Sequence, residues 1–497
     1  MHLLNSRYAL ALLTGALSSL AFAPVGAYPL APFGLAVLFV MLSETGKARP
    51  ILTAFFYGLG FFGAGVSWVY VSLHDYGGMS APLALLATFL FCALLALFPA
   101  LAGGVKYRRK AGLAVQFLIW LPAAWTLLEW LRGWILTGFP WLAMGYSQVP
   151  DSPFAGYAPL LGVYGVSFVA ALTAGALAWT WRSRASLVMA SRGLVLVLVL
   201  IGLGAALKTV NWTRPFGAPF SVALVQGNIP QEMKWRPEVA AATLQTYLGL
   251  AESTRARLVV LPETALPVFF FDLPGAYKNH LRTIGQGRGG DVLAGVPSGD
   301  SSGHYLNSVA SFGVAPTQFY HKHHLVPFGE FIPPGFGWVL DLLQIPLSNF
   351  SRGAISQTPL SVAGQKVAVN ICYEDVFGEE IIRALPTATL LVNVSNDAWF
   401  GDGFAARQHR QISQMRALET GRMMLRATNT GATAIIDAKG RVLSELELSR
   451  RGILEGVGQG YQEMTPYARF GNLPVVLGLA ILLFAAGLGQ RLVKRQR

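Results

Sequence analysis

Residues 367–375 read Val-Ala-Val-Asn-Ile-Cys-Tyr-Glu-Asp, an apolar run that ends in a thiol and a group of polar side chains. Apolar runs bounded by turns are typical of β-strands. Similar runs, separated by turns and helical patterns, recur between residues 215 and 467. The strand-like runs are 220–225, 258–261, 292–296, 308–312, 367–371, 390–394 and 433–436, and the helical patterns are 237–252 and 405–422. Strands that alternate with helices predict a layered α/β sandwich, in which 433–436 pairs with 442–446 through a turn at Lys439 and Gly440.

The chain as a whole is much more apolar than an ordinary soluble protein. Of its 497 residues, 53% are hydrophobic and 13% are charged, whereas about a quarter of the residues in soluble domains are charged. Crossing the hydrocarbon of a membrane takes roughly 20 mostly apolar residues. Eight runs approach this length: 8–23, 29–42, 51–73, 81–101, 113–128, 158–181, 193–210 and 473–488. We therefore predict a polytopic α-helical membrane bundle of about eight spans, although the first run could also be a cleavable signal peptide.

The distribution of charge predicts the orientation of this bundle. Lys and Arg number 38 against 25 Asp and Glu, a formal net charge of +13, which by itself suits nucleic acid, an anionic lipid surface or membrane topology. Short cytoplasmic loops of membrane proteins collect basic residues. Alternate loops do so here, at Arg7, Lys47, Arg49, Lys106, Arg108, Arg109, Lys110, Arg182, Arg184, Arg192, Arg491, Lys494, Arg495 and Arg497. We therefore expect a membrane domain of seven helices over 1–212, an extracytoplasmic domain over 213–467, an eighth helix with a basic cytoplasmic tail over 468–497, and no nucleic-acid partner.

The two cysteines, Cys92 and Cys372, differ in their surroundings. A disulfide between them is implausible, because Cys92 lies in the middle of the fourth apolar run. Most free cysteines are buried small hydrophobes, and Cys372 could be one. Its place at the end of a strand, where a sharp turn would present the thiol above the sheet, favours a nucleophile instead.

A nucleophilic thiol needs a base and a positive group, and the same domain offers both. Glu263 follows the apolar run Leu258-Val-Val-Leu-Pro, where partial burial would raise the pKa of its carboxyl toward that of a useful general base. The alternative is a solvated carboxylate that caps a helix. Lys322 lies among aromatic and apolar neighbours, and its alternative is a surface cation beside a histidine cluster.

That histidine cluster raises the question of a metal. Imidazole is a common zinc ligand, but neighbouring histidines do not readily converge on one ion. No HExxH pattern occurs, and the domain has no second cysteine. A P-loop is also missing, and neither G-x-G-x-x-G run, 58–63 or 285–290, follows a strand-like run and opens a helical pattern as the nucleotide-binding fingerprint does, so we expect neither a metal nor a nucleotide cofactor. The histidines concerned are His321, His323 and His324.

Taken together, these residues resemble a known family. Leu-Pro-Glu263, a lysine about 60 residues further on and Cys372-Tyr-Glu about 50 beyond it are similar to the Glu-Lys-Cys triad of the nitrilase superfamily. The joined membrane domain narrows the resemblance to the apolipoprotein N-acyltransferase family, and it covers nearly the whole chain. Further similar motifs are Glu129-Trp-Leu-Arg-Gly-Trp-Ile-Leu-Thr-Gly-Phe-Pro-Trp, Val225-Gln-Gly-Asn-Ile-Pro-Gln, His324-Leu-Val-Pro-Phe-Gly-Glu-Phe, Asn396-Asp-Ala-Trp-Phe-Gly and Pro466-Tyr-Ala-Arg.

The resemblance implies roles for individual residues. It places the nucleophile at Cys372, the general base at Glu263 and the lysine at Lys322, on an extracytoplasmic nitrilase-like αββα sandwich. It also implies substrate-binding or supporting roles for Trp235, Glu330, Tyr373, Glu374 and Trp399. Two alternatives stay open: the two additional glutamates only hold loops or the lysine in place, and Trp399 is a core aromatic residue.

The resemblance further implies a reaction and a location. The expected enzyme is a phospholipid:apolipoprotein N-acyltransferase that moves an acyl chain from a membrane phospholipid to the α-amine of a diacylglyceryl-cysteine, through a thioester and with ping-pong kinetics. We expect a monomeric, multi-pass protein of the bacterial inner membrane, with its catalytic domain in the periplasm, both termini in the cytoplasm and no cofactor. Two rivals are a membrane-tethered nitrilase-type amidase, in which water is the acceptor, and a non-catalytic lipoprotein-binding membrane protein.

Overall fold

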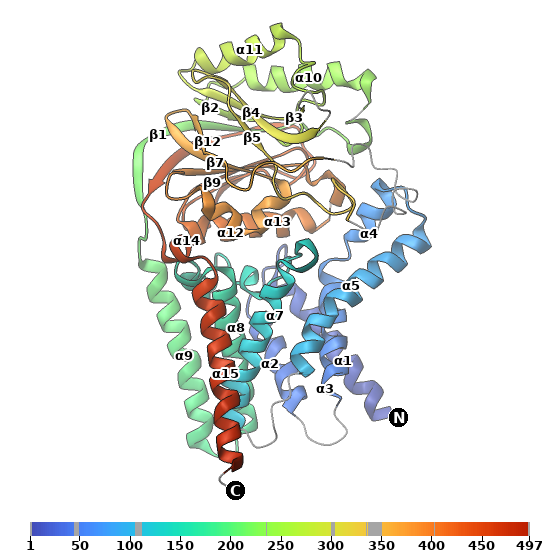
Figure 1. Ribbon diagram of the computed structural model, residues 1–497, viewed down its shortest axis with the longest axis vertical. Helices are drawn as coiled ribbons and strands as arrows, with labels where there is room; N and C mark the ends of the chain where they lie inside the picture. Colours follow the sequence, from blue (N-terminus) through green and yellow to red (C-terminus); the bar gives the residue numbers. More distant parts are fainter. Residues whose placement is uncertain are drawn as a thin grey trace. The chain divides into compact units, whose positions relative to one another are not determined.

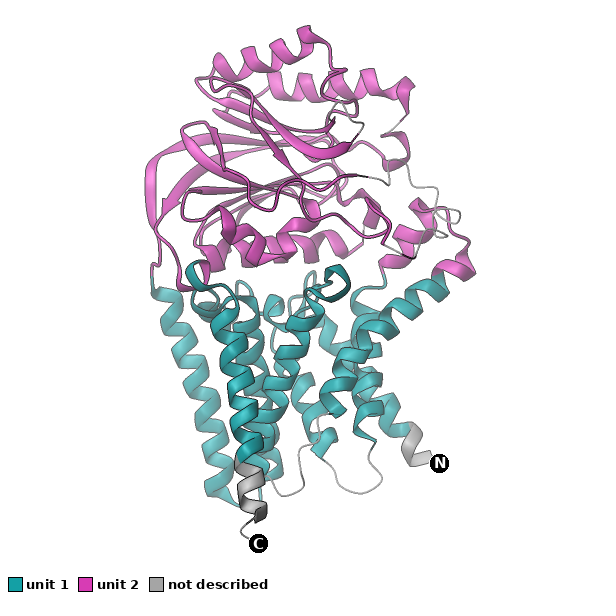
Figure 2. Cartoon of the chain, in the orientation of Figure 1, with its two compact units in different colours: residues 1–67, 85–210, 469–497 teal, residues 68–84, 211–468 magenta. Residues whose placement is uncertain are grey.

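The computed structural model describes residues 2–495 apart from 44–48, 105–111, 235, 300–303, 334, 336–349 and 402. Contacts within the chain divide it into two compact units (Figure 2). One unit comprises residues 1–67, 85–210 and 469–497, and the other comprises 68–84 and 211–468. The sequence placed all of 1–212 in one domain, whereas the structure groups the short segment 68–84 with the α/β unit.

The first unit is built from helices. Their bounds are α1 His2–Ser18, α2 Leu30–Ser43, α3 Pro50–Gly65, α5 Ala81–Gly104, α6 Leu113–Val115, α7 Leu121–Arg132, α8 Ala158–Arg182, α9 Leu187–Thr209 and α15 Leu473–Arg495. Within the described residues, four helical stretches are long and apolar enough to cross a membrane, namely 81–104, 113–132, 153–182 and 187–209. A fifth is obtained if Pro50–Gly65 and Val69–Tyr76 count as one span. Length and hydropathy thus support four or five of the eight predicted spans.

The third predicted span, 51–73, is not one continuous helix. Helix α3 ends at Gly65, and helical structure resumes only with α4 (Val69–Val71) and the π-helical turn η2 (Ser72–Tyr76). The later part makes polar contacts in the α/β unit, where the Ser72 hydroxyl donates to the carbonyl of Trp399 at 2.7 Å. A hydropathy pattern does not reveal such a break in a helix, because the residues on both sides of the break are apolar.

The second unit is a sandwich of two sheets (Figure 1). In the described residues, each sheet has six strands, in the orders β12-β1-β2-β3-β4-β5 and β11-β10-β9-β8-β7-β6. The strands of the first sheet are β1 Arg214–Gln226, β2 Leu258–Val260, β3 Asp291–Gly299, β4 Tyr305–Gly313, β5 Phe319–His321 and β12 Gly452–Gln462. Those of the second are β6 Leu360–Val362, β7 Gln365–Ile371, β8 Leu390–Ser395, β9 Met424–Thr428, β10 Ala434–Ile436 and β11 Val442–Glu445.

Helices cover both outer faces of this sandwich. Helices α10 (Pro237–Glu252) and α11 (Gly275–Gln286) pack on the first sheet, and α12 (Gly378–Ile381) and α13 (Ala405–Thr420) pack on the second (Figure 1). A short helix, α14 (Pro466–Phe470), follows β12. Val, Leu and Ile side chains from both sheets form the core between them, among them Val222, Leu258, Val260, Val367, Val392 and Leu425. The predicted αββα sandwich is confirmed.

Parallel pairing in the middle of each sheet sets the position of the site. Strands β1, β2 and β3 are parallel, and so are β7, β8 and β9. Neighbouring parallel strands end at the same edge of a sheet, so the residues that follow them gather there. Glu263 comes just after β2, Cys372 follows β7, and Asn396 follows β8.

Most predicted strands and helices agree with the structure. All seven strand-like runs overlap observed strands, and the predicted hairpin is present, with Ile435 opposite Ser444. The helix predicted over 405–422 ends at Thr420, because Gly421 takes a left-handed conformation (φ 64°) that caps it. The sequence missed β5, β6, β9, β12 and α11. Strand β12 carries four glycines, and β9 has Arg426 at its centre, so neither shows a plain apolar run.

Candidate active site

The turn at Cys372 has the strained backbone expected of a presented nucleophile. Cys372 follows β7 directly and begins the 3-10 turn η9 (Cys372–Val376). Its φ is 53°, in the left-handed region that residues other than glycine rarely adopt. Such a conformation persists only where the surroundings hold it in place. Here the Cys372 carbonyl accepts hydrogen bonds from Asn393 Nδ2 at 3.2 Å and His409 Nε2 at 3.3 Å.

Glu263 is a buried carboxylate surrounded by donors. Its side chain accepts hydrogen bonds from Asn307 Nδ2 at 2.8 Å and from the backbone N–H of Asn396 at 2.9 Å. Lys322 Nζ lies 3.4 Å from Glu263 Oε1. These contacts hold both oxygens of the Glu263 carboxyl group in place. The solvated, helix-capping alternative does not fit this burial.

Lys322 is buried between two carboxylates rather than exposed beside the histidines. Only 1% of its side chain is accessible, and Nζ contacts Glu330 at 2.8 Å as well as Glu263. Burial by itself would lower the pKa of Lys322, but the charges of Glu330 and Glu263 outweigh it and raise the pKa above its ordinary value. Lys322 is therefore an ammonium group, suited to stabilising negative charge rather than to accepting a proton.

The Cys372 thiol is neutral at rest. Burial is the largest effect on it and raises its pKa well above the ordinary value, and the charge of Glu263 acts in the same direction. Lys322 opposes both without reversing them. A protonated thiol is the starting state that general-base catalysis requires, since the proton then moves during the attack.

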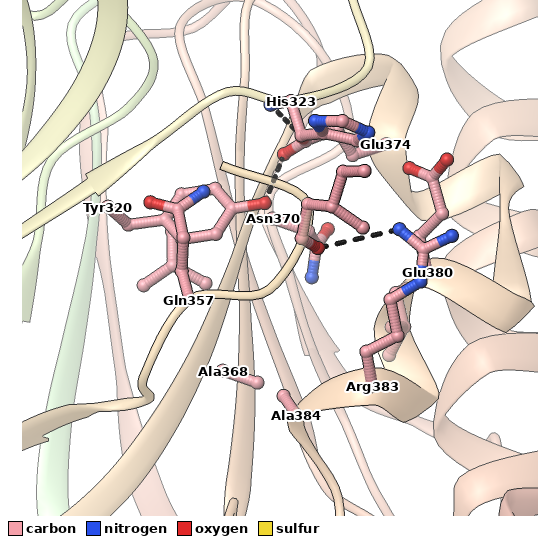
Figure 3. A pocket seen from close by; sticks show the side chains of 12 residues that line it. Tyr320, His323, Gln357, Ala368, Asn370, Glu374, Glu380, Arg383 and Ala384 are labelled. Carbon is pink, nitrogen blue, oxygen red and sulfur yellow. Dashed lines mark hydrogen bonds between the residues drawn. The ribbon is translucent and has the colours of Figure 1, made fainter. Parts of the chain in front are cut away.

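The two supporting glutamates hold different partners. Glu330 touches Lys322 directly and also accepts the backbone N–H of Val326 at 2.9 Å. Glu374 accepts hydrogen bonds from the Tyr320 hydroxyl at 3.0 Å and from the backbone N–H groups of Ile371, His323 and His324 at 2.7 Å, 2.7 Å and 3.1 Å (Figure 3). Burial raises the pKa of Glu374 to about 7, and the backbone donors oppose this rise. Glu374 thus ties the segment that carries Lys322 to the turn at Cys372.

Two of the three remaining predicted residues, Tyr373 and Trp399, are described by the structure. Tyr373 is buried, and its ring packs edge to face against Phe377 at 5.3 Å. The carbonyl of Trp399 accepts the Ser72 hydroxyl, and its ring lies 6.2 Å from that of Tyr76. Trp235 lies outside the described residues.

Sequence reasoning missed three polar residues at the site. Asn307 Nδ2 bridges Glu263 and Glu330 at 2.8 Å each, and the Asn396 backbone holds the second oxygen of Glu263. Lys234 is a second buried lysine, whose Nζ donates to the Glu263 carbonyl at 3.1 Å, and burial lowers its pKa to about 8. The local signals were the lysine directly before Trp235 and the motif that begins at Asn396. The side chain of Asn307 lies within a strand, where no motif distinguishes it.

The histidine cluster does not converge on one point. His321 contacts the Ser308 hydroxyl at 2.8 Å, His323 the Gly353 carbonyl at 2.9 Å, and His324 the Glu380 carboxylate at 3.1 Å. Among the described residues, no three His, Cys, Asp or Glu side chains are grouped as metal ligands. A cavity of about 50 Å³ lies beside Glu374, lined in part by Tyr320, His323, Gln357, Asn370 and Arg383 (Figure 3). This volume suits a few water molecules, and none of the three residues of the predicted triad lines the cavity.

Comparison with known proteins shows which domain families the chain contains and which proteins it is similar to. Residues 221–456 match the carbon-nitrogen hydrolase family, and residues 14–176 match the apolipoprotein N-acyltransferase N-terminal domain. An apolipoprotein N-acyltransferase of Nitrosomonas europaea is 51% identical over 94% of this chain and 94% of its own length. One from Chromobacterium violaceum is 47% identical over 97% of this chain and 93% of its own. A solved carbon-nitrogen hydrolase from Helicobacter pylori G27 aligns at 19% identity with 48% of this chain and 89% of its own, with a TM-score of 0.37.

The α/β unit is thus a carbon-nitrogen hydrolase domain. Since the similarity to the relatives extends through both units, the chain belongs to the apolipoprotein N-acyltransferase family.

Proposed function

We propose that this protein transfers an acyl chain from a membrane phospholipid to the N-terminal α-amine of the diacylglyceryl-cysteine of an apolipoprotein. The observation that carries the proposal is a thiol on a strained turn in the same domain as a buried carboxylate–ammonium pair, Glu263 and Lys322. Membership of the family supports the choice of an amine over water as the acceptor. The geometry of Cys372, Glu263 and Lys322 supports the role of each residue in the reaction.

In the first half-reaction, Glu263 accepts the proton of the Cys372 thiol as the sulfur attacks the ester carbonyl of the phospholipid. The Lys322 ammonium, with the backbone N–H of Tyr373, stabilises the negative oxygen of the tetrahedral intermediate. The ester C–O bond then breaks, and Glu263 returns its proton to the departing lysophospholipid oxygen. An acyl thioester on Cys372 remains.

In the second half-reaction, the free α-amine of the lipoprotein attacks this thioester and loses a proton to Glu263. The C–S bond breaks, an amide is formed, and the proton returns to the sulfur of Cys372. Because the first product leaves before the second substrate reacts, the kinetics are ping-pong. No step needs a cofactor.

We also propose that the enzyme is a monomeric, multi-pass protein of the bacterial inner membrane with eight spans over 1–212 and 468–497. The catalytic domain, 213–467, lies in the periplasm, and both termini lie in the cytoplasm. The basic residues of alternate loops support this topology. The exposed apolar side chains of α9, such as Leu187, Leu198 and Val199, support insertion of this helix in a membrane, because a large exposed apolar surface is unfavourable in water. A membrane site spares the cost of drawing an acyl chain into water, about 0.8 kcal/mol per CH₂.

The test is reconstitution of purified protein with phospholipid and a diacylated lipopeptide, followed by mass spectrometry. We expect an acyl adduct on Cys372 with phospholipid alone, and an N-acylated peptide once the lipopeptide is added. Release of free fatty acid without N-acylated peptide would favour the amidase rival. Full transfer by Cys372→Ala would exclude a thioester on Cys372. Cys92→Ala is the matched control, since this buried thiol belongs to the other unit and should leave the adduct unchanged.

A further inference from the structure

A buried group of four charged side chains lies beneath the turn at Cys372. Asp375 of η9, Asp397 of the 3-10 turn η11 (Asp397–Phe400), His409 of α13 and Arg426 of β9 are each at most 1% exposed. We call them the ionic cluster. His409 Nε2 lies 2.8 Å from Asp375 and Nδ1 lies 2.9 Å from Asp397, while Arg426 bonds the same two carboxylates at 3.3 Å and 2.8 Å.

The ionic cluster is balanced in charge. Each ring nitrogen of His409 faces a carboxylate oxygen, which accepts a hydrogen bond from an N–H, so the doubly protonated ring suits both contacts. The pKa of His409 is raised accordingly: Asp375 and Asp397 outweigh burial and the charge of Arg426. Two cations therefore neutralise two anions. Breaking a buried arrangement of this kind leaves one charge without compensation.

One arm of the cluster reaches the nucleophile. His409 Nε2 contacts the Cys372 carbonyl at 3.3 Å, and Asn393 Nδ2 contacts the same oxygen at 3.2 Å. Arg426 Nη1 fixes Asn393 by donating to its Oδ1 at 2.6 Å. Both donors to the strained residue are thus oriented by the cluster.

A second arm reaches the general base. Asp397 accepts the Ser395 hydroxyl at 2.8 Å, and the residue between them, Asn396, donates its backbone N–H to Glu263 at 2.9 Å. The cluster therefore anchors the chain on both sides of the amide that holds the base. The proposed mechanism gives none of its four members a role.

We infer that Asp375, Asp397, His409 and Arg426 are positioning residues. They hold the Cys372 turn and the Glu263 carboxylate in fixed positions relative to each other during both half-reactions. The inference rests on the proposed roles of Cys372 and Glu263. It assigns the cluster no contact with either lipid substrate. Its loss should therefore lower kcat without changing KM.

The test uses the full-length protein and the variants His409→Gln and His409→Gln/Asp397→Asn. The single variant removes a cation, and the double variant restores the balance of charge. We expect a loss of about 100-fold in kcat for the single variant, the scale of a small misplacement of catalytic groups. The double variant should recover about tenfold, since the two residues are coupled. Gln414→Ala is the matched control, because this buried side chain of α13 bonds the Gly440 carbonyl, away from the ionic cluster, and the variant should keep wild-type kcat.

Alkylation of Cys372 by iodoacetamide gives a readout that needs no substrate. In His409→Gln the rate of alkylation at a fixed pH should fall, because a cation near the thiol is lost, and with it part of the thiolate, while the other charged groups that face the thiol stay. Those groups are Glu263, Lys322, Asp397 and Lys234. In the double variant the rate should recover. This measurement keeps its meaning even where the wild type fails to acylate the lipopeptide, which would count against the proposed function alone.

Two results would overturn the inference. The first is a wild-type kcat and a wild-type alkylation rate in folded His409→Gln, and the second is a double variant no better than the single one. If His409→Gln does not fold, Arg426→Lys replaces it, because one ammonium cannot bond Asn393, Asp375 and Asp397 in the geometry of the guanidinium. Wild-type kcat in folded Arg426→Lys would equally refute a positioning role.

Discussion

Lys322→Arg is the sharpest test of the site, because it keeps the charge and changes only its shape. Lys322 Nζ is enclosed by Glu263 at 3.4 Å and by both oxygens of Glu330 at 2.9 Å and 2.8 Å, with 1% of the side chain exposed. A planar guanidinium needs more room and directs its donors in a fixed fork. Overpacking a buried site costs about 1–3 kcal/mol of stability. Displacing an oxyanion donor costs about 10²–10³ in kcat, or roughly 3–4 kcal/mol.

We therefore expect Lys322→Arg to fold with a lowered thermal midpoint and to lose about 10²–10³ in kcat. The assay is the rate of N-acylation of a diacylated lipopeptide, with the rate of thioester formation on Cys372 followed by mass spectrometry. The control is Lys366→Arg, an exposed lysine of the same domain that contacts the Ser361 hydroxyl, and it should behave as wild type. A folded Lys322→Arg variant with wild-type kcat would refute the role of a compact ammonium at this position.

Three further predictions concern residues around the triad. Asn307→Ala removes the bridge between Glu263 and Glu330 and should lower kcat about 100-fold with little change in KM, and an unchanged kcat would show that the bridge is dispensable. Gly295→Ala places a Cβ 2.4 Å from the Pro262 carbonyl and 2.7 Å from Glu263 Cα, so it should lower both thermal stability and kcat, whereas Gly249→Ala, with nothing within 4 Å, should lower neither. The pKa of Lys234 is lowered to about 8, so between pH 8 and its ordinary value of 10.5 the unfolded chain binds more protons. Over that pH range the stability of the wild type, measured by thermal unfolding, should rise with pH relative to that of Lys234→Met. If the stabilities of the two proteins changed with pH in the same way, the pKa of Lys234 would not be lowered in the folded state.

The parts of the site that could be predicted are those with a local signal. Glu263 and Cys372 end strongly apolar strands, and Lys322 belongs to a distinctive aromatic segment, so each stands out within a few residues of sequence. Their convergence in space could not be predicted from such local signals, because it depends on parallel strands that belong to two different sheets and lie far apart in the sequence.

Other parts could not be predicted because their partners are distant in sequence. His409 reads as one more polar residue on a helix, and its pairing with Asp375 exists only after α13 packs on the second sheet. Asn307 gives no signal for the same reason. The end of α3 at Gly65 was missed because composition stays apolar on both sides of the break.

The buried, protonated thiol has a consequence for the lifetime of the protein. Oxidants such as peroxides attack the thiolate, and sulfinic and sulfonic acids formed from it are not repaired in most proteins. Because burial and Glu263 raise the pKa of Cys372, little thiolate is present at neutral pH until a substrate ester arrives. A thiol kept in this form resists oxidants without a disulfide partner to protect it.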